Sequence, residues 1–184
     1  DQTWADEERS KIGDERFRRE HACEFIIDEE TLINSIKLSE LESKIPIYKT
    51  GQVRWFKQPS KDHIYVVALD PSLGTGGDSA AIQVFEADTT DQVAEWQNNR
   101  TTIPEQIKLL AEINKTICEA TGQPDNLYYS LENNTIGEAA LISLFEYGEE
   151  NIKGIMISEP KQVGNTRRYR RGFNTTNKSK LSAC

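Results

Sequence analysis

The segment from His63 to Asp70 (HIYVVALD) constrains the fold most, because it is a nearly continuous run of apolar and β-branched residues that ends in a carboxylate. This pattern predicts a strand buried on both faces of a sheet. Pro71 to Asp78 (PSLGTGGD) has the composition of a turn, and Ser79 to Ala87 (SAAIQVFEA) predicts a second strand. We therefore expect a sheet whose central strand opens a hairpin.

Further strands and a helix are expected downstream. Val93 to Asn98 predicts a third strand. Thr102 to Glu105 (TIPE) has the form of a capping box, with a proline tolerated in the first turn. Apolar residues at helical spacing follow as far as Gly122, which predicts a helix that ends there.

A second pair of strand and helix comes next. Asn126 to Glu132 (NLYYSLE) predicts a fourth strand that again ends in a carboxylate. Thr135 to Glu138 (TIGE) predicts a second capping box, opening a helix that Gly148 ends, and Ile152 to Ile157 predicts a fifth strand. The resulting order, βββαβαβ, defines an α/β layer architecture.

The two ends of the chain carry weaker signals. Residues 1–45 are polar and lack a core of their own, with short helices expected around 6–10 and 14–23. Lys44 to Pro59 predicts a short hairpin or a linker. Residues 164–182 are rich in Gly, Asn, Thr, Arg and Ser, which predicts a mobile loop rather than a regular element.

The charge of the chain is unevenly distributed. The net charge is −8, from 22 basic and 30 acidic residues. Residues 160–184 hold seven of the basic residues and no Asp or Glu, so this tail carries +7 and residues 1–159 carry −15. The acidic portion repels a polyanion unless cations intervene, whereas the tail is suited to neutralising phosphates. A basic run is equally typical of a flexible, solubilising terminus.

Composition and motifs exclude several classes of protein. No stretch approaches the ~20 consecutive apolar residues of a transmembrane helix, so a membrane protein is not expected. The three cysteines, Cys23, Cys118 and Cys184, form no CxxC pair, which argues against a disulfide framework or a cysteine zinc site. The sequence also lacks GxxxxGK[ST], GxGxxG, HExxH and GxSxG motifs. Metal chemistry with oxygen ligands remains.

Two carboxylates have positions that favour such chemistry. Asp70 and Glu132 each end a predicted buried strand, and ligands of open α/β sheets bind at the carboxyl ends of the strands. If the two strands are neighbours, both side chains reach one crevice, where Mg²⁺ or Mn²⁺ would compensate their charges. Acidic residues at strand ends also commonly begin turns, and for either residue alone that explanation suffices.

Asp78 is a third candidate. It follows the glycine-rich turn and lies eight residues after Asp70, so its side chain could return toward the same crevice. An ordinary acidic turn residue would look the same. Glu138 needs no such role, because the predicted capping box already explains it.

The stretch VVALDPSLGTGGDSAAIQVF, with YYSLENNTIGEAAL further along the chain, resembles the nuclease domain of the large terminase subunits of tailed bacteriophages, especially T-even-like myoviruses. That family places an Asp at the end of the first strand, a second Asp eight residues later, and a Glu-Asn pair at the end of the fourth strand. These positions correspond to Asp70, Asp78, Glu132 and Asn133. Upstream, GDERFRREHACEFI followed by TLI is similar to the segment that joins the terminase ATPase domain to the nuclease.

The resemblance implies an RNase H-like (ribonuclease H/integrase) fold, with a mixed sheet flanked by helices. It implies metal-dependent endonucleolytic cleavage of double-stranded DNA, which cuts concatemeric genomes during packaging. Two Mg²⁺ or Mn²⁺ ions would occupy the complete site, bridged by Asp70, with Glu132 holding one ion and Asp78 supporting a metal or its waters. The implied partners are DNA, a portal and a small terminase subunit, and the implied location is the host cytoplasm.

The basic residues of the tail are expected to grip DNA through its backbone phosphates. They are Lys161, Arg167, Arg168, Arg170, Arg171, Lys178 and Lys180.

The sequence departs from the family pattern at the last essential Asp, which in the family lies in a later helix or loop. No acidic residue follows Glu159 here. We therefore expect residues 46–184 to form a nuclease domain that is truncated at its C-terminal end. Such a fragment is expected to bind metal and cut DNA poorly by itself. The similarity upstream implies that residues 1–45 lead from a preceding ATPase domain.

Two other functions stay open. An actin- or sugar-kinase-like phosphotransferase also carries Asp and glycines in its first hairpin, although that fold needs two such domains; ATP binding would favour it. A non-catalytic DNA-gripping module of a packaging motor is the other, and metal-dependent cleavage would count against it.

Overall fold

A computed structural model of the chain describes residues 2–12, 42–163, 166–169 and 171–175. The chain divides into two units, one of Lys44–Thr175 and one of Asp1–Ser43 with Thr176–Cys184. In the latter unit the structure describes helix α1 (Gln2–Ile12), which includes the helix expected around 6–10. The helix expected at 14–23 lies outside the described residues. In the described parts of the chain, no helix combines the length and apolar character needed to cross a membrane.

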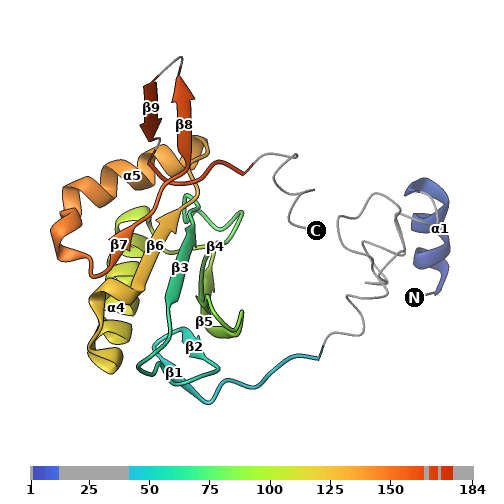
Figure 1. The fold of residues 1–184 in the computed structure, drawn as a ribbon. Coiled ribbons are helices and arrows are strands. Elements are labelled where there is room, and N and C mark those ends of the chain that lie inside the picture. The colour runs from blue at the N-terminus through green and yellow to red at the C-terminus, as the bar shows by residue number, and fades with distance from the viewer. Residues whose placement is uncertain (1, 13–41, 164–165, 170, 176–184) are drawn as a thin grey trace. The chain divides into compact units, whose positions relative to one another are not determined.

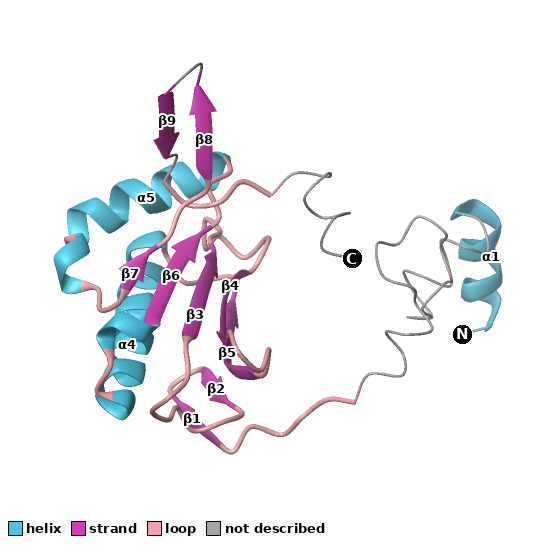
Figure 2. Cartoon of the chain, viewed as in Figure 1, coloured by secondary structure: helices cyan, strands magenta, loops and turns pink. Residues whose placement is uncertain are grey.

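The unit from Lys44 to Thr175 is built on a seven-stranded sheet and helices α4 and α5 (Figures 1 and 2). Its strands are β1 (Tyr48–Thr50), β2 (Val53–Trp55), β3 (Tyr65–Asp70), β4 (Ala80–Glu86), β5 (Gln92–Asn98), β6 (Leu127–Leu131), β7 (Ile155–Met156), β8 (Pro160–Val163) and β9 (Thr166–Tyr169). Its helices are α4 (Ile103–Thr121), α5 (Thr135–Tyr147) and the 3-10 turns η1 (Pro124–Asn126) and η2 (Glu149–Asn151).

The sheet is mixed, with the strand order β1-β2-β5-β4-β3-β6-β7. Strand β3 pairs antiparallel with β4 and parallel with β6, and β6 pairs parallel with β7. The expected α/β class and the order βββαβαβ are confirmed. The β1–β2 hairpin that precedes this core corresponds to the hairpin expected between Lys44 and Pro59.

Only one face of β3 is buried, contrary to the expectation of burial on both faces. Tyr65, Val67 and Leu69 point into the core, whereas Ala68 and Asp70 are exposed on the opposite face. The apolar run did not reveal this difference, because its residues on the open face, Val66 and Ala68, are also apolar.

Helices α4 and α5 pack against each other and lie on the same side of the sheet (Figure 1). Their buried residues, such as Ile107 and Leu144, close the core together with the inward-facing residues of the strands. The predicted capping box of α4 is confirmed, since the Glu105 carboxylate accepts hydrogen bonds from Thr102 N at 2.9 Å and Thr102 Oγ1 at 2.7 Å. Gly122 ends α4 in the left-handed conformation, with φ 68°.

The capping box expected at Thr135–Glu138 is wrong. The N-cap of α5 is Asn134, whose Oδ1 accepts from Ile136 N at 3.1 Å and Gly137 N at 3.0 Å. Asparagine is among the strongest N-cap residues, so it takes the cap one position earlier than the threonine.

Two other expectations need correction near the end of the described chain. The strand expected at 152–157 is confined to Ile155–Met156, because Ile152 closes the turn η2 and Gly154 has a φ of 94°, which is not an extended conformation. The loop expected over 164–182 is partly a strand, since β9 pairs antiparallel with β8. Val163 pairs with Thr166, which leaves Gly and Asn as the two intervening residues, a composition typical of tight hairpins.

Candidate metal centre

The structure brings Asp70 and Glu132 together at one edge of the sheet. Asp70 is the last residue of β3, and Glu132 directly follows β6. Leu69 and Leu131 are the last paired residues of these parallel strands, and Glu132 N donates to the Leu69 carbonyl at 2.8 Å. The two carboxylates therefore lie side by side on strands about 4.8 Å apart.

Both carboxylates line one pocket of about 530 Å³. Ala68 and Ser130, which pair with each other two residues earlier on the same strands, lie on the same face and line it as well. Asp70 is exposed and Glu132 is half-buried. The crevice expected at the carboxyl ends of neighbouring strands is thus present in the structure.

Asn134 connects Glu132 to helix α5. Its Nδ2 donates to Glu132 Oε2 at 3.2 Å, while its Oδ1 caps the helix. Gly137 lies so close to this corner that a Cβ on it would collide with the Glu132 carbonyl oxygen. The start of α5 and the acidic residue are therefore packed as one unit.

Gln106 fixes the chain directly after Asp70. This fully buried side chain on α4 donates from Nε2 to the Ser72 carbonyl at 2.8 Å and the Thr101 carbonyl at 2.7 Å, and its Oε1 accepts from Ser72 N at 3.3 Å. The turn that follows β3 is thereby tied to the helix that supports the sheet.

Asn133 holds a later segment whose residues Phe173 and Thr175 line the pocket. Its N donates to the Phe173 carbonyl and its Nδ2 to the Arg171 carbonyl, both at 2.6 Å. Phe173 N donates in turn to the Leu131 carbonyl at 2.9 Å, and Phe173 forms a parallel bridge with Glu132. The side chain of Phe173 lines the pocket beside the two carboxylates.

Asp78 is not brought into this pocket. It lies exposed in the turn before β4 and is absent from the residues that line the cavity. Because Ala81 of β4 pairs with Asp70, the turn carrying Asp78 nevertheless lies beyond the same edge of the sheet.

Three of the predicted DNA-binding residues lie on the β8–β9 hairpin, where Lys161 pairs with Arg168. Lys161 belongs to β8, and Arg167 and Arg168 belong to β9. Arg171 is engaged inside the unit, since its Nη1 lies 2.5 Å from Glu149 Oε2 and its guanidinium carbon lies 5.2 Å from the centre of the Phe145 ring. Arg170, Lys178 and Lys180 lie outside the described residues.

The donor set fits a hard divalent cation in part. Carboxylate oxygens are the ligands that Mg²⁺ prefers, and this ion usually binds through one or two carboxylates and keeps several waters. Across the described ranges, no cluster of three or more His, Cys, Asp or Glu side chains is placed to hold a metal. Asp70 and Glu132 thus fit one hydrated ion.

Three supporting residues were not predicted to act at this site. Asn134 carried a sequence signal, since Asn before a helix predicts an N-cap, but the threonine capping box was preferred. Gln106 and Phe173 carried none, because their contacts with the site depend on long-range packing.

The solved structures that the chain matches include large terminase nucleases of phages. The large terminase nuclease from thermophilic phage G20c with bound magnesium matches with 20% identity and a TM-score of 0.46, over 61% of this chain and 53% of that one. The form with bound cobalt matches with 19% identity and a TM-score of 0.46, over 64% and 56%. The Thermus phage P74-26 large terminase nuclease domain matches with 20% identity and a TM-score of 0.42, over 61% and 52%.

The chain thus spans about half the length of the solved nucleases that it matches. No protein-family model and no curated protein matches it. The RNase H-like fold class implied by the sequence motifs agrees with the mixed sheet and the strand order described above.

Proposed function

We propose that the chain contains the metal-dependent endonuclease domain of a phage DNA-packaging terminase, which cuts concatemeric double-stranded DNA. The observation that carries this proposal is the placement of Asp70 and Glu132 on adjacent parallel strands, with both side chains in one pocket. Both residues are among the four that correspond to the terminase-like sequence motifs.

In this proposal Asp70 and Glu132 hold Mg²⁺ or Mn²⁺. A bound divalent ion lowers the pKa of its water and neutralises charge that develops on phosphodiester oxygens during hydrolysis. Asn134 orients the Glu132 carboxylate through its 3.2 Å hydrogen bond. The complete site would hold two ions, for which Asp78 would support a metal or its waters and a further acidic residue would supply the remaining ligand.

The remaining assignments follow from the same proposal. Residues 1–45 would lead from an ATPase domain, and residues 46–184 would belong to the nuclease domain. The basic residues of the tail would contact backbone phosphates. A portal and a small terminase subunit would be partners of the full-length protein, which would act in the host cytoplasm.

A non-catalytic DNA-gripping module is the second candidate. The observation that favours it is that, among the described residues, only Asp70 and Glu132 supply carboxylates to the pocket. Two-metal hydrolysis needs more ligands than these two provide.

Nicking of a supercoiled plasmid in Mn²⁺ or Mg²⁺, by a protein in which the further acidic ligand is also supplied, separates the two candidates. The nuclease proposal predicts metal-dependent nicking that Asp70→Asn or Glu132→Gln lowers at least about 100-fold, equivalent to about 2.7 kcal/mol of transition-state stabilisation. Glu119→Gln, a change of an exposed carboxylate on α4, is the matched control and should leave nicking unchanged. DNA binding without nicking in either metal, by the protein that also carries the further acidic ligand, would contradict the nuclease proposal and support the gripping module.

A further inference from the structure

A second basic segment lies at the start of the folded unit. Between Lys44 and Lys61 the sequence contains five Lys or Arg residues and no Asp or Glu. This segment includes the β1–β2 hairpin, whose strands form one end of the sheet. Such a concentration of positive charge is unusual in a chain with a net charge of −8.

Strand register connects this hairpin to the candidate metal centre. Residues directly opposite each other on neighbouring strands project from the same face of a sheet. One such row begins beside the pocket and ends at the hairpin, and every step in it is a pair in the sheet. It runs from Ala68 through Gln83, Glu95 and Arg54 to Lys49.

The row lies on the open face of the sheet, the face of Asp70. Ala68 and Asp70 alternate with the buried residues of β3, so their side chains leave the sheet on the same side. Four strand spacings separate β3 from β1, or about 19 Å. At ~3.4 Å of duplex axis per base pair, this distance corresponds to about five or six base pairs.

A polar hollow of about 660 Å³ lies at the basic end of this row. Lys49 and Arg54 line it together with hydrogen-bonding side chains of Ser79, Gln97, Asn98 and Asn99. Arg54 Nη2 lies 3.0 Å from Glu95 Oε1, yet its side chain stays 43% exposed. A guanidinium has five N–H donors, so this ion pair leaves donors for a second anion. Within the described residues, no ion pair engages Lys49, which is exposed.

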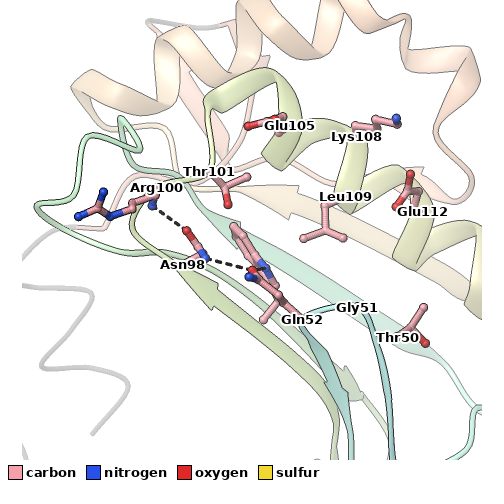
Figure 3. A pocket seen from close by; sticks show the side chains of 11 residues that line it. Thr50, Gly51, Gln52, Asn98, Arg100, Thr101, Glu105, Lys108, Leu109 and Glu112 are labelled. Atoms are coloured by element: carbon pink, nitrogen blue, oxygen red, sulfur yellow. Dashed lines mark hydrogen bonds between the residues drawn. The ribbon is translucent and has the colours of Figure 1, made fainter.

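Side-chain hydrogen bonds hold the turn between β1 and β2 in place. Gln52 Oε1 accepts from Asn98 Nδ2 at 3.0 Å and from Trp96 Nε1 at 3.4 Å, and Asn98 Oδ1 accepts from Arg100 N at 2.7 Å (Figure 3). These bonds fix the hairpin to the end of β5, between the hollow just described and a second one of about 600 Å³ that faces α4. The hairpin can therefore present its cations in a fixed place.

We propose that the β1–β2 hairpin contacts the DNA backbone. Lys49 and Arg54 would bind phosphates about five base pairs from the phosphodiester bond that is cleaved at Asp70 and Glu132. This inference rests on the proposed function, in that DNA is the ligand. The contact is sequence-tolerant, because two cations and a set of amide and hydroxyl groups recognise phosphate rather than base edges.

Duplex binding tests the contact apart from catalysis. Fluorescence anisotropy of a labelled 30-base-pair duplex, in EDTA and at 50 to 200 mM KCl, gives the slope of log K against log salt. If each of the two cations neutralises one phosphate, Lys49→Gln with Arg54→Gln should lower the magnitude of that slope by about 1.8. The charge-conserving pair Lys49→Arg with Arg54→Lys should keep the wild-type slope.

Lys115→Gln is the matched control, since it removes an exposed lysine from α4, which packs on the opposite face of the sheet. An unchanged slope in the glutamine pair, an equal loss in the charge-conserving pair, or no duplex binding by the wild-type chain at 50 mM KCl would each overturn the contact. Because the binding assay contains no divalent metal, the contact can fail while plasmid nicking persists, and nicking can fail while the contact holds.

Discussion

Asp70 and Glu132 owe their proximity to the backbone. The last ladder pair, Leu69 with Leu131, and the bond from Glu132 N to the Leu69 carbonyl place the two residues at the same level of adjacent strands. Side chains held this way can converge on a cation without first contacting each other. At the level of single residues, the candidate site thus depends on strand register more than on side-chain packing.

A different pair of residues sets a pH dependence at the other end of β3. His63 Nδ1 lies 2.7 Å from Asp88 Oδ2. This hydrogen bond raises the pKa of His63 above its usual 6.5 and lowers the pKa of Asp88 below its usual 3.8. The pair therefore stabilises the fold most between pH 3.8 and pH 6.5, the usual pKa values of the two groups.

The contribution of His63 to the stability of the fold has a predictable dependence on pH. The contribution of His63 is fully present below pH 6.5 and is lost as pH rises through the raised pKa of the folded state. The urea concentration at the unfolding midpoint of the wild-type chain should decrease as the pH is raised from 6 to 9. The substitution His63→Gln should make this decrease smaller. An identical pH profile in both proteins would show that the ion pair does not contribute.

At the level of elements, α5 and the candidate site share one residue. Asn134→Ala removes the N-cap of α5 and should cost about 1 kcal/mol of unfolding free energy, measured by urea denaturation. It also removes the hydrogen bond that orients Glu132.

Asn134→Asp separates these two roles. Aspartate caps helices as well as asparagine does, so Asn134→Asp should unfold with about the wild-type free energy. The aspartate carboxylate cannot donate a hydrogen bond to Glu132, so metal-dependent nicking by Asn134→Asp should stay below that of the wild-type protein. Full nicking activity in this variant would contradict the orienting role of Asn134.

Elements with strong local signals were predictable from the sequence. The β-branched run that ends at Asp70 and the capped, periodic helix that ends at Gly122 lie within a few residues of the observed β3 and α4. These signals are local: side-chain period, cap chemistry and turn glycines. The strand β7 was predicted too long, since its pairing with β6 depends on a neighbour distant in sequence. The β8–β9 hairpin was missed although its two strands are adjacent in sequence, because the polar, basic composition of this segment favoured a loop.

The candidate site was predictable in part for the same reason. The two carboxylates could be selected because both end strands, and the strand order confirms that these strands are neighbours. The contacts that Gln106 and Phe173 make around the site could not be predicted, because they join segments more than thirty residues apart. The open face of β3 was likewise hidden by its apolar composition.

Across the whole molecule, charge is separated by place. Net charge alone, −8, argues against a polyanionic ligand. The sheet nevertheless carries the carboxylates of Asp70 and Glu132 at the ends of β3 and β6. The cations of Lys49 and Arg54 lie on β1 and β2, on the same open face of the sheet as Asp70. If both proposals hold, this separation would give one surface with a place for metal and a place for phosphate.

The proposed function requires that Asp70 and Glu132 bind a divalent cation together. Electron paramagnetic resonance of free Mn²⁺, titrated with the chain, measures this binding without requiring catalysis. We expect saturable binding by the wild-type chain and by the control Glu119→Gln, and its loss in the double variant Asp70→Asn with Glu132→Gln. Equal Mn²⁺ binding by the wild-type chain and the double variant would contradict the account.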